Sequence, residues 1–398
     1  MKTNIPIFLF FFLIISFSCS EEELIEPTER YLKIYDDRIY NASYDPISIV
    51  ETETGSSLVL TEINLANSSF SGSSIIRIDS VGDISNTSAV AENFVAPVGS
   101  LVTIGNMHYY ATMDEQSLLV HFIPVASDGT VGDPIPVNST LRYPLALSKT
   151  RDDRLLLLSY DPNNRLSVIS IINIDGTVAQ SQGYSVGPAN DVEPIIFNHF
   201  TDPSSALTFF VGETSDGLFY FNGFFNFTLS LVFTNFGDDP TGVVQGQQSF
   251  TGIRSILHLT GNTFSLMGYQ YDRNFLRPQA TLATNDISAS VNLFASSIPE
   301  VMPNAPSKSI LLSREGLDDV VVTATETQSR QTILYFHSTD GVLLGIERLG
   351  SLNPFTFSDI IATDDGGLKV LGTTFLASRF ERIYLSRLSA DEVNRIAN

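Results

Sequence analysis

Short apolar runs separated by turn residues fill most of the chain. The clearest stretch reads "RLLLLSY", "DPNN", "RLSVISIINI", "DG" over residues 154–176. Runs of this length, rich in branched aliphatic residues and bounded by Asp, Asn, Pro and Gly, predict β-strands joined by tight turns. A helical signal is confined to the last residues, "ADEVNRIAN". The pattern therefore predicts an all-β fold.

The strand pattern recurs with a regular period. Gly82, Gly129 and Gly176 each follow an apolar run and lie 47 residues apart. A period of roughly 40 to 50 residues with four short strands in each unit is typical of a β-propeller. We expect seven units, with six or eight as the alternatives. They begin near Pro46, Ala96, Tyr143, Val192, Gln247, Met302 and Phe357.

Two features concern the regularity and closure of this ring. The fourth and fifth units are the least regular, since Asn222 and Gly223 stand at an expected turn inside a long aromatic run and Pro278 interrupts a strand. The last unit has only "EVNRIAN" for its fourth strand. The early run "ERYLKIYDDRIY", residues 29–40, is predicted to supply the missing strand and remove an open edge.

The N-terminus reads as an export signal. Residues 1–18 contain one early lysine and an apolar run too short to span a bilayer comfortably, as in a secretory signal peptide. A buried helix is the alternative. The following "SFSC" resembles the lipobox of bacterial lipoproteins, which implies that Cys19, the single cysteine, becomes a lipidated first residue anchored in the membrane.

Three acidic residues follow that cysteine. Glu21, Glu22 and Glu23 resemble the surface-export signal of Bacteroidota lipoproteins, which implies an outer-membrane protein facing the exterior. A solvated tether is the alternative. The expected organisation is a signal peptide over residues 1–18, a tether over 19–30 and a propeller domain over 31–398.

One segment of the propeller carries a second resemblance. Residues 363–392, "TDDGGLKVLGTTFLASRFERIYLSRLSADE", resemble the repeat of bacterial extracellular propellers, with a Gly-Gly strand, a Gly-Thr-Thr and an aromatic strand. The match is weaker in units one, three and six and poor in four and five. It implies fold and export, whereas function depends on the site.

Composition excludes several partners and reactions. The net charge of −22 argues against nucleic acid and anionic membrane surfaces. The histidines do not fall at zinc-ligand spacing, and calcium loops, phosphate loops and nucleophile elbows are missing from the sequence. We therefore expect neither a metal nor a cofactor.

Acidic pairs offer a route to polysaccharide hydrolysis, which needs two carboxyl groups across the sugar. Asp191 with Glu193, and Asp238 with Asp239, occur in segments expected to lead into an innermost strand and to surround one mouth of the channel. Solvated loop acids are the alternative. Their convergence on one pocket would favour an enzyme, and their dispersal would count against one.

Aromatic residues offer a binding route, because sugars stack on flat rings with a polar edge. We expect Arg142, Tyr143, Tyr269, Tyr271 and Arg273 near loops, where they would belong to a ligand face, with a structural role as the alternative. The absence of Trp weakens a glycan platform. The favoured function is a non-enzymatic surface lipoprotein that binds an extracellular glycan or an envelope protein. The alternative is an extracellular polysaccharide-degrading enzyme.

Overall fold

The structure is a computed structural model. It describes residues 29–35, 44–52, 55–138, 140–202, 207–246, 251–271, 273–289, 293, 297–350, 353–376 and 380–398. Cys19 and Glu21, Glu22 and Glu23 lie outside these residues. None of the helices in the described part of the chain has the length and apolarity needed to cross a bilayer.

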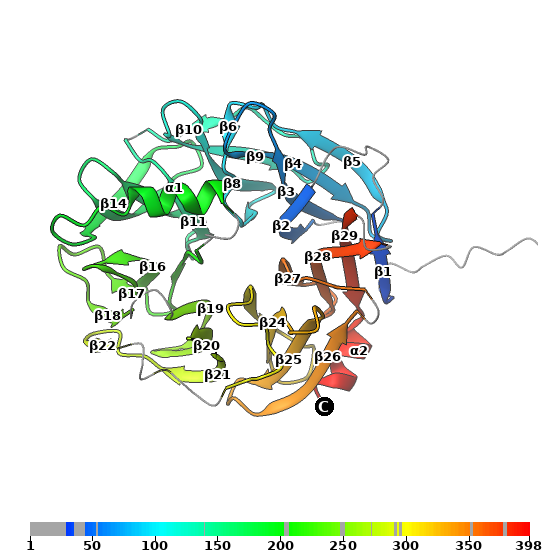
Figure 1. The fold of residues 1–398 in the computed structure, drawn as a ribbon. Helices are drawn as coiled ribbons and strands as arrows, with labels where there is room; N and C mark the ends of the chain where they lie inside the picture. Colours follow the sequence, from blue (N-terminus) through cyan, green and yellow to red (C-terminus); the bar gives the residue numbers. More distant parts are fainter. Residues whose placement is uncertain are drawn as a thin grey trace, which may run out of the picture.

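The described residues form seven sheets arranged as blades around a ring, which confirms the predicted seven-bladed propeller (Figure 1). Blade 1 holds β2 (Tyr44–Glu51), β3 (Ser57–Asn64), β4 (Ser71–Ile78) and β5 (Ile84–Ala89). Blade 2 holds β6 (Phe94–Val95), β7 (Val102–Ile104), β8 (Met107–Asp114), β9 (Val120–Ala126) and β10 (Ile135–Pro136). Blade 3 holds β11 (Pro144–Lys149), β12 (Leu155–Asp161), β13 (Leu166–Ile172) and β14 (Val178–Ser185).

The second half of the chain completes the ring. Blade 4 holds β15 (Phe210–Glu213), β16 (Phe219–Phe225), β17 (Thr228–Thr234) and β18 (Gly242–Gln245). Blade 5 holds β19 (Thr251–Thr260), β20 (Thr263–Gln270) and β21 (Arg273–Thr281), while β22 (Ile287–Ala289) pairs in parallel with β18. Blade 6 holds β23 (Ser307–Leu312), β24 (Val320–Glu326), β25 (Thr332–Ser338) and β26 (Leu343–Leu349). Blade 7 holds β27 (Asp359–Ala362), β28 (Leu368–Leu376) and β29 (Phe380–Leu388).

The N-terminal strand closes the ring, as predicted. β1 (Tyr31–Ile34) pairs antiparallel with β29, and Tyr31 lies opposite Arg387. Blade 7 thus combines both ends of the propeller, with β1 as its outer strand. The short helix α2 (Ala390–Ile396) follows β29 and begins with a capping box between Ser389 and Glu392.

The repeated glycines occupy the turns between the third and fourth strands of their blades. Gly82, Gly129 and Gly176 have φ angles of 90°, 83° and 84°, which non-glycine residues rarely adopt. A Cβ atom on Gly176 would also collide with the carbonyl oxygen of Pro136 in the preceding blade. The 47-residue spacing therefore records one turn in successive blades, where the chain both reverses and packs on its neighbour.

The irregular units differ from the expectation in three places. The turn in blade 4 lies at Asn226 and Phe227, both at positive φ, and Gly223 is inside β16. Pro278 is accommodated within β21 at a register shift, where a missing N–H costs no ladder hydrogen bond.

The third difference is a helix that the sequence pattern did not predict. The helix α1 (Glu193–Thr201) precedes blade 4, where we expected strand. Its first turn carries Pro194, a residue suited to that position, but no side chain caps its N-terminus. The local helical signal of this segment is weak. Burial of Ile196 against blades 3 and 4 stabilises the helix through tertiary packing.

Candidate functional site

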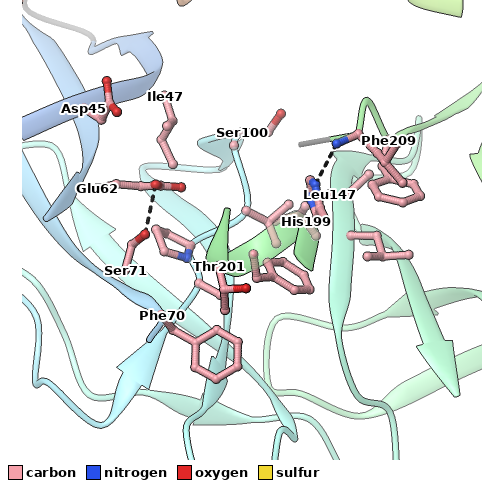
Figure 2. A pocket seen from close by; sticks show the side chains of 18 of the residues that line it. Asp45, Ile47, Glu62, Phe70, Ser71, Ser100, Leu147, His199, Thr201 and Phe209 are labelled. Carbon is pink, nitrogen blue, oxygen red and sulfur yellow. Dashed lines mark hydrogen bonds between the residues drawn. The ribbon is translucent and has the colours of Figure 1, made fainter. Parts of the chain in front are cut away.

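A cavity of about 630 Å³ opens at the face of the ring where the innermost strands begin. Its walls come from β2, β3, β11 and β15, the connection 96–100, and the end of α1 (Figure 2). Blades 1 to 4 therefore contribute, and Ser358 before β27 of blade 7 adds to the lining. The volume falls within the range of roughly 300 to 1,000 Å³ typical of ligand sites. We take this cavity, termed the mouth cavity, as the candidate site.

Two carboxylates stand side by side on one wall of the mouth cavity. Asp45 of β2 and Glu62 of β3 are directly opposite in the antiparallel ladder, so their side chains leave the same face of the sheet. Ser71 Oγ donates a hydrogen bond of 3.0 Å to Glu62 Oε2. Opposed like charges repel, and the pair is therefore an electrostatically unfavourable arrangement in the absence of a proton or a cation.

The protonation of Glu62 depends mainly on its burial, which raises its pKa to about 7. The hydrogen bond from Ser71 lowers this pKa, and the negative charge of Asp45 raises it. Asp45 is exposed to solvent, and partial desolvation on its protein side, together with the nearby charge of Glu381 on β29, raises its pKa. Glu62 therefore titrates close to neutral pH, well above the pKa of an ordinary glutamic acid.

The opposite wall is aromatic and uncharged. His199 of α1 accepts a hydrogen bond of 3.0 Å at Nδ1 from the N–H of Leu207, and burial lowers its pKa to about 4. Its ring centroid lies 4.8 Å from that of Phe200 and 5.0 Å from that of Phe209. The imidazole is consequently neutral at physiological pH, and this wall offers flat apolar surfaces with one ring nitrogen available to donate.

Hydroxyl groups complete the lining. They belong to Ser68, Ser69, Ser71, Ser100, Ser148, Thr201, Thr208 and Ser358. Ser148 Oγ is buried without a hydrogen-bond partner among the described residues. Lysine and arginine are absent from the described residues that line the cavity. The site thus combines hydrogen-bonding hydroxyls, two carboxylates and aromatic faces, and its fixed charge is negative.

Two residues predicted for the ligand face anchor α1 instead of facing the cavity. Tyr143 is buried, and its hydroxyl donates a hydrogen bond of 2.9 Å to Glu193 Oε1. Its ring stacks on Phe200 at 6.3 Å. Burial and the bond to Glu193 raise the pKa of Tyr143. This contact fastens the helix to blade 3, and so positions His199 indirectly.

The four predicted acids do not converge on one pocket. Asp191 and Glu193 lie in the connection between β14 and β15, whereas Asp238 and Asp239 lie in the turn between β17 and β18. The N–H of Asn226, just before β17, donates to the carbonyl oxygen of Ser185 at the end of β14. Asp238 and Asp239 follow the other end of β17. They therefore occupy the opposite face of the ring, and do not lead into an innermost strand.

The remaining predicted residues lie away from the cavity lining. Arg142 precedes β11, and Tyr269, Tyr271 and Arg273 belong to the β20–β21 hairpin of blade 5. Tyr271 is 64 % exposed. The ring of Tyr269 lies 5.0 Å from the guanidinium carbon of Arg254. This hairpin therefore belongs to a surface separate from the mouth cavity.

Sequence reasoning missed the residues that do line the cavity. Glu62 was detectable as the single acid in the apolar run "SLVLTEIN", and Asp45 as an acid at the start of a strand. Their pairing depends on the β2–β3 register, which the sequence pattern does not specify. His199 was not identified because the helix that carries it was not expected.

Comparisons with known proteins support the fold. The chain matches no protein-family model, and no curated protein is similar to it. Among solved structures, a lectin from Burkholderia pseudomallei is 8 % identical with a TM-score of 0.50, over 85 % of this chain and 97 % of the lectin. The β-propeller domain of the Trilobed protease from Pyrococcus furiosus is 9 % identical with a TM-score of 0.47, over 88 % and 95 %.

A third solved structure is a catalytically inactive virginiamycin B lyase from Staphylococcus aureus with quinupristin. It is 13 % identical with a TM-score of 0.48, over 90 % of this chain and all of the lyase chain. Of these three, the match to the Burkholderia pseudomallei lectin, at a TM-score of 0.50 and 8 % identity, shows a shared fold alone. The function must therefore be argued from the site.

Proposed function

We propose that the protein is an outer-membrane lipoprotein, exposed at the cell surface, that binds an extracellular glycan in the mouth cavity without chemical turnover. The observation that carries this proposal is the cavity itself. The hydroxyls donate hydrogen bonds to sugar hydroxyls and accept them, and the carboxylates accept them. Phe200 and Phe209 beside His199 offer rings for the flat faces of a sugar. A concave site of this size suits a glycan chain end better than a flat protein surface.

The membrane part of the proposal rests on the sequence at Cys19. In a Cys19→Ala variant the lipid attachment site is lost, and we expect the protein to move from the membrane fraction to the soluble fraction. Fractionation of cells that express the wild type and the variant measures this. Unchanged membrane association of Cys19→Ala would contradict lipid anchoring.

The binding part is tested with the unlipidated domain in native gels that contain soluble polysaccharides. We expect at least one neutral or amine-bearing polysaccharide to slow the migration of the domain in the gel, and we expect no sugar to be released from that polysaccharide. Ser100→Tyr, which adds a ring at the cavity wall, is expected to reduce the retardation about tenfold. Thr87→Tyr, on the exposed outer strand β5, is the matched control and is expected to leave it unchanged.

The other outcomes discriminate the alternatives. Sugar release would favour a polysaccharide-degrading enzyme. A folded domain that shows neither retardation nor release would overturn the glycan proposal and favour an envelope protein as the partner.

A further inference from the structure

We propose that the ligand carries a primary ammonium group, which binds between the carboxylates of Asp45 and Glu62 in the mouth cavity. The chemical class is an amine-bearing glycan, such as a sugar chain with free amino groups. This inference rests on the proposed function and specifies its ligand.

The first argument is the charge balance of the pair. In the described part of the chain, Asp45 and Glu62 form no salt bridge with a lysine, an arginine or a histidine, and Glu62 receives a side-chain hydrogen bond from Ser71. Two opposed carboxylates without a counter-ion are unfavourable. Protonation of Glu62, or a cation placed between the two carboxylates, would remove the repulsion, and a cationic ligand would provide the second route.

The surrounding charged groups do not supply that cation. Glu381 on β29 adds negative charge, and the neutral His199 faces the cavity from α1. Lys308 on β23 pairs with Asp359 at 2.6 Å. Arg254 on β19 donates to Thr208 Oγ1 and Asn304 Oδ1 and lies over Tyr269, so its hydrogen bonds go to these groups and not to the acidic pair. Among the described residues, the charges that act on Asp45 and Glu62 come from carboxylates.

The second argument is the rest of the lining. Phe200 and Phe209 line the wall that faces the carboxylates, where their rings suit the apolar faces of the sugar that bears the ammonium group. An anionic glycan would meet two like charges. Calcium requires roughly six to eight oxygen ligands, and the described residues hold no group of three or more acidic, histidine or cysteine side chains suited to a metal. The lining therefore favours an organic cation.

The pKa of Glu62 gives the proposal a distinct signature. With a pKa of about 7, Glu62 is mainly protonated at pH 6 in the free protein. An ammonium ligand favours the ionised carboxylate, so binding at pH 6 is expected to release protons from Glu62, up to about one for each ligand less the fraction that unprotonated ligand amines take up. A neutral sugar would release none, because it does not distinguish the two forms by charge.

The test compares two probes with the same sugar backbone. Chitotetraose carries free amines, and its fully N-acetylated form is neutral. Isothermal titration at pH 6 and physiological ionic strength, in buffers of different ionisation enthalpy, measures both affinity and proton release. We expect chitotetraose to bind at least tenfold more tightly and to release protons on binding, and the N-acetylated form to release none.

Two matched variants distinguish binding in the mouth cavity from non-specific attraction by the overall negative charge of the protein. Glu62→Gln is expected to abolish the preference for chitotetraose and the proton release, while the fold is retained because the substitution relieves repulsion. Asp238→Asn removes the same charge on the opposite face of the ring, and is expected to leave both unchanged. Equal losses in the two variants would show non-specific attraction and overturn the proposal.

The outcomes also separate this inference from the proposed function. Equal affinity for the two probes would overturn the ammonium site while glycan binding stands. If neither probe binds, the ammonium assignment is wrong, and the polysaccharide gels decide independently whether glycan binding stands.

Discussion

A chain that begins at Asp36, and so lacks β1, is expected to lose about 3 to 6 kcal/mol of unfolding free energy relative to a chain that begins at Thr28. The reason is the location of β1 at the ring closure. It forms the outer strand of blade 7, and its removal exposes the edge of β29.

The contacts of β1 explain the size of this effect. Tyr31 is 5 % exposed and packs with Ile78 of blade 1 and Ile383 of blade 7. The Tyr35 hydroxyl donates to the carbonyl oxygen of Gly82 at 3.0 Å, and Lys33 pairs with Asp83 at 3.0 Å. The strand thus holds the last blade to the first, and its loss removes both sheet pairing and packing between blades.

Urea titration of the two chains, followed by circular dichroism, measures the difference. The chain from Thr28 is the control because it keeps β1 and the pairs of Arg30 with Glu347 and Glu392. We also expect the shorter chain to self-associate through the open edge, which size-exclusion chromatography detects. Equal midpoints and slopes for the two chains would show that the closing strand does not stabilise the ring.

The second large effect is expected at Lys369, a buried cation between blades 7 and 1. Lys369→Met should destabilise the protein by about 3 to 5 kcal/mol, because it leaves a poorly solvated carboxylate without its counter-ion. Lys369 Nζ lies 2.7 Å from Glu51 Oε1 and donates to Gly55 O and Ser57 Oγ at 2.8 and 3.0 Å. The lysine side chain is 0 % exposed and that of Glu51 is 10 % exposed.

A double substitution and a surface control separate charge from packing. Lys369→Met combined with Glu51→Leu removes both charges, and should regain much of the lost stability. Lys149→Met removes the exposed pair with Asp153, where the side chains are 46 % and 64 % exposed, and should cost less than about 1 kcal/mol. Thermal and urea unfolding measure all three. Similar losses at Lys369 and Lys149 would contradict the role assigned to the buried pair.

The fold was predictable because its signals are local. Apolar strands and turn glycines such as Gly129 and Gly176 repeat within each unit, and each blade is a meander of neighbours in sequence. The closing strand at Tyr31–Ile34 was predictable too, since an incomplete last unit implies a partner elsewhere. The parallel pairing of β22 with β18 and the helix α1 were not predictable, because packing between blades determines them.

The site was much less accessible to sequence reasoning. The acids chosen from loops, Asp191 and Asp238, lie on opposite faces of the ring. Asp45 and Glu62 sit within strands and become a pair through the register of β2 with β3. Their raised pKa values depend on desolvation and on neighbouring charges that the folded chain places beside them, such as Glu381 of blade 7 near Asp45, and no local pattern encodes these.

Local patterns in the chain specify an all-β repeat, its period, the glycine turns at Gly82, Gly129 and Gly176, and the strand that closes the ring, because apolar runs and turn chemistry act between residues close in the chain. The mouth cavity, by contrast, exists only in the assembled ring. Residues as far apart as Asp45 and Ser358 meet there only when blades 1 to 4 and blade 7 are in place. Proximity and burial, which set the charge state and chemistry of the site, arise from that assembly.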